Sequence, residues 1–147
     1  MLVTAGSTNV TTYFMVRSAT NGTAATGLTI TTFDLQYTRT AEEPSTKADA
    51  TALAATNSAH TDNAMIEVDS TSSPGLYRVD WPDAAFATGA AQVFLSLKYS
   101  SAIFTEVLAV DIDELIEGLT REQIMRVLLA EAAGILNKSG TTITMRS

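Results

Sequence analysis

The chain has 147 residues, of which 46% are hydrophobic and 17% charged, and its formal net charge at pH 7 is −7. This length fits one domain, or one domain with a short appendage. It is sufficient to bury a stable core without disulfides or bound metal ions. The negative charge, without any cluster of Lys or Arg, argues against nucleic acid as a partner, and the lack of cysteine excludes disulfides, zinc–thiolate sites and thiol catalysis.

The N-terminal stretch MLVTAGSTNVTTYF lacks the basic lead and apolar block of a signal peptide. No apolar run approaches the roughly 18 residues that a membrane span requires. We therefore expect a soluble protein made in the cytoplasm, with no membrane partner. Residues 1–9 are predicted to be a flexible lead or an arm.

The first predicted strand is Val10–Arg17, where Tyr13 and Met15 alternate with Phe14 and Val16. Because both faces are apolar, this strand is predicted to be buried on both sides or to lie at a contact surface.

After an Asn-Gly turn, a long second strand is predicted over Leu28–Arg39. Its apolar residues change parity midway, so we expect a bulge near Thr31–Thr32 that returns them to one face. These residues are Leu28, Ile30, Phe33, Leu35 and Tyr37.

The Ala-rich stretch Thr40–Asn63 is open to two interpretations. Thr46 and Asp49 have the spacing of a capping box that opens a short helix, whereas Ala50–Ala54 fits an edge strand. A structureless loop of this length is unusual in a compact domain. We prefer the short edge strand.

The next predicted strand is Met65–Val68, with Ile66 and Val68 facing inward. Three more strands follow within Pro74–Val110, because the apolar residues there alternate with polar ones between turn residues. The inward faces are Tyr77, Val79 and Trp81 in the first strand, then Val93, Leu95, Leu97 and Tyr99 in the second, with Ile103–Val110 as the third. The sequence therefore predicts a mainly β fold, a sandwich of about seven strands over residues 1–111.

Residues 112–147 are predicted to form a helix and a terminal strand. Thr120 and Gln123 have capping-box spacing, and Asn137 and Gly140 supply the helix end. The alternating segment Thr141–Arg146 has no hairpin partner of its own, so it pairs with the body, pairs with another chain, or frays. We predict an assembly appendage whose interface residues are Ile124, Val127, Leu128, Ile135, Ile143 and Met145.

Several residues invite a chemical role, and each has a plainer interpretation that we prefer. His60 near Asp62 suggests a triad, but it lies in a polar loop without a nucleophile elbow, so we expect a histidine that is at the surface or that pins the loop. Asp111, Asp113 and Glu114 suggest a calcium site, but acidic residues are also typical of a helix start.

The same holds for the remaining candidates. Asp80 and Asp83 suggest a glycosidase pair but are expected to be turn and cap residues. Trp81 and the tyrosines are expected to lie in the core and not on a sugar-binding surface; the tyrosines are Tyr13, Tyr37, Tyr77 and Tyr99. We therefore expect no catalytic residue, no metal site and no cofactor.

The run Ser58–Lys98 contains His60-Thr61-Asp62, Pro74-Gly75-Leu76-Tyr77, Pro82-Asp83-Ala84 and Phe86-Ala87-Thr88-Gly89. It resembles the immunoglobulin-like N-terminal domain of tailed-phage baseplate upper proteins and related virion proteins. Thr120–Arg146 resembles the helix-then-strand segment that follows this sandwich. In similar proteins that strand usually continues into a further small β region.

The resemblance implies an immunoglobulin-like antiparallel β-sandwich in a non-enzymatic virion component, located in the baseplate, tail, head fibre or capsid decoration. It implies assembly with other virion structural proteins, with copies of the chain in trimers or rings. A receptor- or carbohydrate-binding module on the virion surface is the alternative.

Overall fold

The computed structural model describes residues 1–40, 45–99, 103, 105–113, 121–132, 136–139 and 142–145. The chain divides into two compact units, Met1–Ile112 (unit 1) and Asp113–Ser147 (unit 2).

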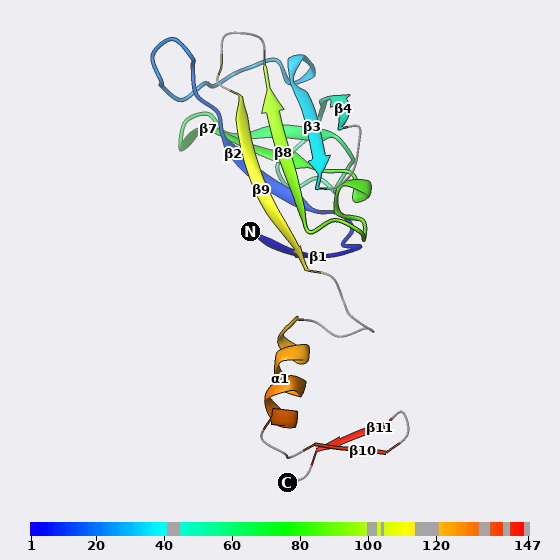
Figure 1. Ribbon diagram of the computed structural model, residues 1–147. Coiled ribbons are helices and arrows are strands. Elements are labelled where there is room, and N and C mark those ends of the chain that lie inside the picture. The colour runs from blue at the N-terminus through cyan, green and yellow to red at the C-terminus, as the bar shows by residue number, and fades with distance from the viewer. Residues whose placement is uncertain are drawn as a thin grey trace. The chain divides into compact units, whose positions relative to one another are not determined.

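Unit 1 is built from two β-sheets (Figure 1). In the described residues the larger sheet has the order β1-β9-β8-β3-β4 and the smaller one β2-β7-β6-β5. This arrangement confirms the predicted mainly β class, and the immunoglobulin-like assignment stays a prediction. The strands are β1 (Leu2–Thr4), β2 (Thr11–Met15), β3 (Asp34–Arg39), β4 (Thr46–Asp49), β5 (Thr51–Ala52), β6 (Ala64–Asp69), β7 (Ser73–Asp80), β8 (Gln92–Lys98) and β9 (Glu106–Asp113).

One hydrophobic core lies between the inner faces of the two sheets. The alternation predicted for β7 and β8 is confirmed for six inward side chains, which are fully buried: Tyr77, Val79, Trp81, Val93, Leu95 and Leu97. Tyr99, also predicted to face inward, follows the end of β8 and is half-buried. Phe33, immediately before β3, packs on Tyr77 of β7 with ring centroids 5.6 Å apart. Burying a large side chain of this kind stabilises the fold by about 1.5–3 kcal/mol.

The N-terminal residues form a strand and are not the flexible arm that we predicted. β1 pairs with β9 at the edge of the five-stranded sheet, and Val3 is buried in the core. The N–H of Gly6 donates to the carbonyl of Phe86 at 2.7 Å. Phe86 belongs to the short 3₁₀ turn η2 (Asp83–Phe86). These partners are distant in sequence, so local composition did not indicate them.

β2 buries one of its two apolar faces within unit 1. Phe14 and Val16 are buried, whereas Tyr13 is 58% exposed and Met15 41% exposed. Burial on both sides is therefore wrong for unit 1, and the contact-surface interpretation stays a prediction.

The long strand predicted over Leu28–Arg39 is interrupted, not bulged. A 3₁₀ turn, η1 (Ile30–Thr32), precedes β3, and the N–H of Phe33 donates to the carbonyl of Ile30 at 3.0 Å. This local bond takes the turn out of the sheet ladder and accounts for the change of parity.

The Ala-rich stretch supplies an edge strand to each sheet, which confirms the preference for strand over helix. β4 lies at the edge of the five-stranded sheet and β5 at the edge of the four-stranded sheet. Between them, buried Ala50 donates its N–H to the carbonyl of Phe33 at 2.9 Å. β5 pairs with β6 in parallel, so the sandwich departs from the fully antiparallel form that we expected.

The inward face of β6 differs from the prediction. Met65 is fully buried, whereas Ile66 and Val68 are half-buried. The reason is register: Met65 lies opposite Val79 of the core face, and Ile66 lies opposite Arg78 of the outer face.

Unit 2 contains one helix and one hairpin in its described residues. The helix α1 (Arg121–Ala132) begins where predicted, while Thr120 lies outside the described residues. The predicted unpaired terminal strand is wrong: β11 (Thr142–Met145) pairs with β10 (Leu136–Ser139). Asn137, which we expected at the helix end, lies in β10. Among the described residues, no helix has the length and apolarity needed to cross a bilayer.

Candidate interaction surfaces

The outer face of β7 carries a buried ion pair beneath the 53–62 segment. Arg78 donates from Nε and Nη2 to the two carboxylate oxygens of Asp80, at 2.9 and 2.8 Å. Arg78 Nη1 also donates to the carbonyls of Thr56 and Ser58, at 2.7 and 3.0 Å. The pair therefore fixes this segment to the sheet.

Asp80 is fully buried and accepts two further hydrogen bonds, from the Thr11 hydroxyl at 2.7 Å and the Thr61 N–H at 3.2 Å. Burial opposes ionisation of this carboxyl, but the hydrogen bonds from Arg78, Thr11 and Thr61 outweigh it and lower its pKa. Asp80 is thus a structural carboxylate and not the turn residue that we expected.

His60 pins the same segment, which is one of the two roles that its sequence context left open. Its Nε2 lies 3.3 Å from the Val10 carbonyl, and its Nδ1 lies 3.8 Å from the Asp62 carboxylate. The side chain is largely buried. This geometry positions the segment against the start of β2.

The acidic residues considered for a calcium site or a glycosidase pair have other positions or other partners in the structure. Asp111 and Asp113 lie in β9, not at a helix start, and Glu114 is outside the described residues. Asp111 accepts from the Gln92 side chain at 2.8 Å, and Asp83 accepts from the Asn9 N–H at 2.8 Å. Within the described part of the chain, no three His, Asp or Glu side chains gather as a metal ion requires.

Most of the aromatic side chains belong to the core. Trp81 is fully buried and donates from Nε1 to the Thr12 hydroxyl at 2.8 Å. Tyr77 is also buried, and its hydroxyl donates to the Ala25 carbonyl at 3.1 Å. Half-buried Tyr99 packs on Phe33 with ring centroids 4.7 Å apart. Tyr13 differs, because its ring is exposed.

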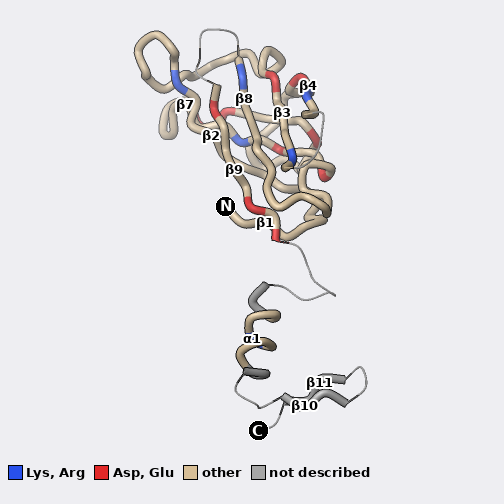
Figure 2. The backbone as a smooth tube through the Cα atoms, in the orientation of Figure 1, with Lys and Arg blue, Asp and Glu red and all other residues tan. Residues whose placement is uncertain are grey.

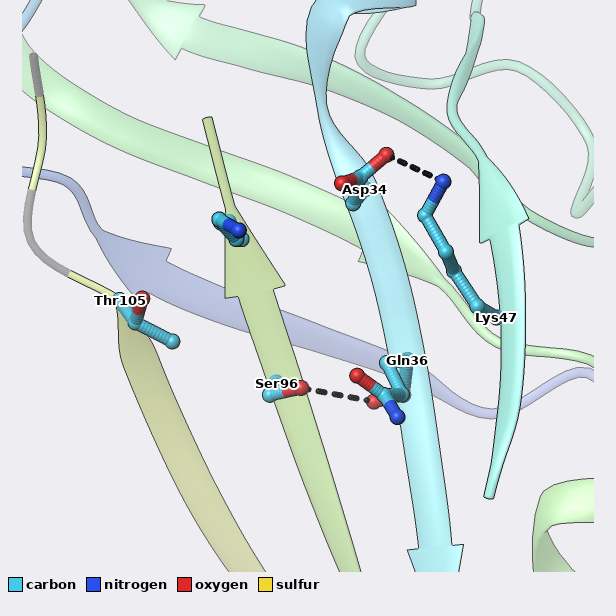
Figure 3. A pocket seen from close by; sticks show the side chains of 6 residues that line it. Asp34, Gln36, Lys47, Ser96 and Thr105 are labelled. Carbon is cyan, nitrogen blue, oxygen red and sulfur yellow. Dashed lines mark hydrogen bonds and ion pairs between the residues drawn. The ribbon is translucent and has the colours of Figure 1, made fainter. Parts of the chain in front are cut away.

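A partly open polar hollow of about 340 Å³ lies on the outer face of the five-stranded sheet (Figure 3). Lys47 Nζ bridges Asp34 at 2.8 Å and Asp49 at 3.2 Å, and hydrogen bonds to these two carboxylates raise the pKa of Lys47. Exposed ion pairs of this kind contribute little to stability. The hollow offers positively and negatively charged groups as well as neutral hydrogen-bonding groups. It is lined by Asp34, Gln36, Lys47, Ser96, Lys98 and Thr105.

Large apolar side chains are exposed on both outer faces of unit 1. Tyr13 and Met15 lie on β2, and Phe94 and Val107 lie on β8 and β9. Charged residues along unit 1 occur in small scattered groups (Figure 2). The exposed apolar side chains are therefore available for contact and are not surrounded by a dense group of charged residues.

In unit 2 the predicted interface residues differ in position and exposure. Leu128 is 53% exposed, and Ile124 and Val127 are half-buried. Ile143 and Met145 lie in β11, opposite Lys138 and Leu136. Ile135 lies outside the described residues. Met125 and Leu129, which the predicted stripe omitted, are also exposed.

Comparison with known proteins found no matching family model, no matching curated protein and no matching solved structure. The resemblance of Ser58–Lys98 to phage virion proteins therefore stays a prediction.

Proposed function

We propose that this chain is a non-enzymatic structural component of a bacteriophage virion, acting through protein–protein assembly with other virion proteins and with its own copies. The observation that carries the proposal is the exposure of large apolar side chains on a separate small unit. Met125, Leu128 and Leu129 of α1 are each more than half exposed, and such side chains are typical of surfaces that become covered on association.

Unit 1 also supports the proposal, in which it acts as a rigid body. The resemblance to virion proteins lies in Ser58–Lys98, which supplies β6, β7 and β8 with their fully buried core residues. In this proposal unit 1 gives the component its shape, and exposed strands and side chains make the contacts. The part of the virion stays open among baseplate, tail, head fibre and capsid decoration.

The alternative, a receptor- or carbohydrate-binding module, has less support. Sugar-binding surfaces stack aromatic rings against the ligand, and the residue best suited to that role, Trp81, is fully buried. The polar hollow around Lys47 has hydrogen-bonding groups but no aromatic side chain in its lining.

The test is to purify particles released by the strain that carries this gene and to quantify their proteins by mass spectrometry. We expect the chain to band with particles in a gradient at a fixed ratio to the major capsid protein. Its complete separation from particles after the gradient would contradict the proposal.

A further inference from the structure

We propose that the free edge of β2 pairs antiparallel with β2 of a second copy, with Tyr13 on the two-fold axis. This inference rests on the proposed assembly function, which it deepens by naming the strand, the partner and the register.

The backbone of β2 has one side engaged and one side free. The Val10 carbonyl accepts from the Trp81 N–H at 3.1 Å, and the Val16 N–H donates to the Gly75 carbonyl at 2.8 Å. Even-numbered residues therefore direct their backbone groups toward β7. Since these directions alternate along a strand, Thr11, Tyr13 and Met15 direct theirs away. In the described sheet, β2 has no neighbour on that side.

The other three sheet edges of unit 1, as described, carry features that discourage pairing. β5 has two residues and β1 has three, and β4 carries Lys47 and Asp49 in ion pairs. Short and charged edge strands are the usual protection against edge-to-edge association. β2 has five residues, Thr-Thr-Tyr-Phe-Met, with no charge and no proline. Among the four edge strands β1, β2, β4 and β5, it is the one best suited to pair.

A second copy fits this edge because the strand is its own complement. With Tyr13 opposite Tyr13 of the partner copy, Thr11 lies opposite Met15 in both directions. All the outward-facing residues of β2 then form hydrogen-bonded pairs, each exchanging two N–H···O bonds. The exposed side chains of Tyr13 and Met15 gain cross-strand neighbours on the outer face.

The lack of charge in β2 and the chain geometry at its two ends also favour pairing with a second copy of the chain. Two copies each carry a net charge of −7, so an uncharged strand lets them approach with the least repulsion. The free edge is bounded by Asn9, whose φ of 56° turns the chain out of the strand. At the other end Ser18 forms a bridge with Ile103. Both limits restrict pairing to the central residues of β2.

The first test uses the absence of natural cysteine in the chain. Opposed Cα atoms in a hydrogen-bonded antiparallel pair lie about 5.5 Å apart, within reach of a short bis-maleimide. In the full-length chain, Tyr13→Cys is expected to give covalent dimers at least tenfold faster than Phe94→Cys. Phe94 is the matched control, since it is an exposed aromatic residue on the interior strand β8.

The second test addresses the two-fold register. Tyr13→Lys and Tyr13→Glu each place like charges across the axis, so each variant alone is expected to lose association about tenfold or more in sedimentation. Mixing the two variants opposes unlike charges and is expected to restore it. A wild-type chain whose mass is the same at every concentration, or equal cross-linking at positions 13 and 94, would overturn the inference.

Failure here and failure of the virion proposal are distinguishable. Cross-linking is measured on purified protein without particles, whereas virion membership is read from particle composition. A chain that fails to cross-link yet bands with particles would remove the β2 contact and keep the virion role.

Discussion

The guanidinium of Arg78 and the carboxylate of Asp80, two residues apart on β7, form a doubly hydrogen-bonded pair with no exposure of Asp80. Breaking a buried pair by removing one charge costs about 3–5 kcal/mol, because the other charge stays buried and unpaired. Asp80→Asn is therefore expected to lower the free energy of unfolding by about that amount at pH 7, measured by denaturant titration.

The matched control is Asp34→Asn, which breaks the Lys47–Asp34 pair. That pair is exposed, with side-chain exposures of 51% and 37%, so the expected cost is within about 1 kcal/mol. Equal losses in the two variants would contradict the buried role of Asp80.

The Asp80 pair also makes stability depend on pH. Because the folded pKa of Asp80 lies below its usual value, its contribution is complete above the unfolded pKa of about 3.9. The contribution is lost as pH falls through the lower folded pKa. The stability difference between wild type and Asp80→Asn is therefore expected to shrink in this acidic window. A constant difference from pH 7 to pH 2 would count against the assignment.

The Trp81–Thr12 hydrogen bond gives a second prediction. Thr12→Val keeps the shape of the side chain but leaves the buried indole N–H without its acceptor, at a cost of about 1–3 kcal/mol. Thr12→Ser keeps the hydroxyl and is expected to recover most of that loss. Trp81 is the only tryptophan in the chain, so its fluorescence follows unfolding in both variants. Identical midpoints for Thr12→Val and wild type would show that the bond contributes nothing.

Glycine at position 75 is required for both conformation and space. Its φ is +78°, and a Cβ there would lie 2.8 Å from the Val16 carbonyl oxygen. Gly27 has a φ of +66° but no atom within 4 Å of a Cβ. Gly27→Ala is therefore expected to cost about 1–2 kcal/mol from conformation alone. Gly75→Ala is expected to cost distinctly more, in the same denaturant assay, because the backbone must also move.

Period-two alternation predicted the core faces of β7 and β8, since large apolar residues recur at every second position of the inner face, whereas the outer face also carries Arg78, Asp80, Ser96 and Lys98. It failed where both faces carry apolar residues: in β6 the pairing of Met65 with Val79, not the local pattern, selects the inner face. The β1–β9 pairing and the crossing between sheets at Ala50 depend on partners far away in sequence. Local composition therefore carries no signal for them.

Some features of the candidate surfaces could likewise be predicted from the local sequence, and others could not. The exposed Tyr13 and Met15 were foreseeable as a second apolar face on the first strand. The burial of Arg78 and Asp80 was not, because it requires the 53–62 segment to cover β7. The β10–β11 hairpin was missed because Asn137 and Gly140 are as typical of a hairpin as of a helix end.

Tyr77 gives a prediction at alkaline pH. Burial raises its pKa to about 12, so the folded state favours the protonated hydroxyl. Its contribution to stability is complete below the unfolded pKa of about 10 and is lost as pH rises toward 12. Tyr77→Phe is expected to cost about 1 kcal/mol at pH 7, through loss of the bond to the Ala25 carbonyl. The variant is also expected to show a smaller loss of stability between pH 10 and 12, measured by urea unfolding.

Self-association through unit 2 gives the last prediction. If the predicted stripe of α1 is covered in the assembly, Leu128→Asp removes a leucine that association buries and places a charge there. Burying one leucine contributes about 1.5–3 kcal/mol, so the association constant is expected to fall tenfold or more in sedimentation equilibrium. Leu129→Asp tests how wide the contact is, because Leu129 is adjacent and 64% exposed but lies outside the stripe. Equal weakening by both variants would show that a wider arc of α1 forms the contact, and no weakening by either would remove α1 from the interface.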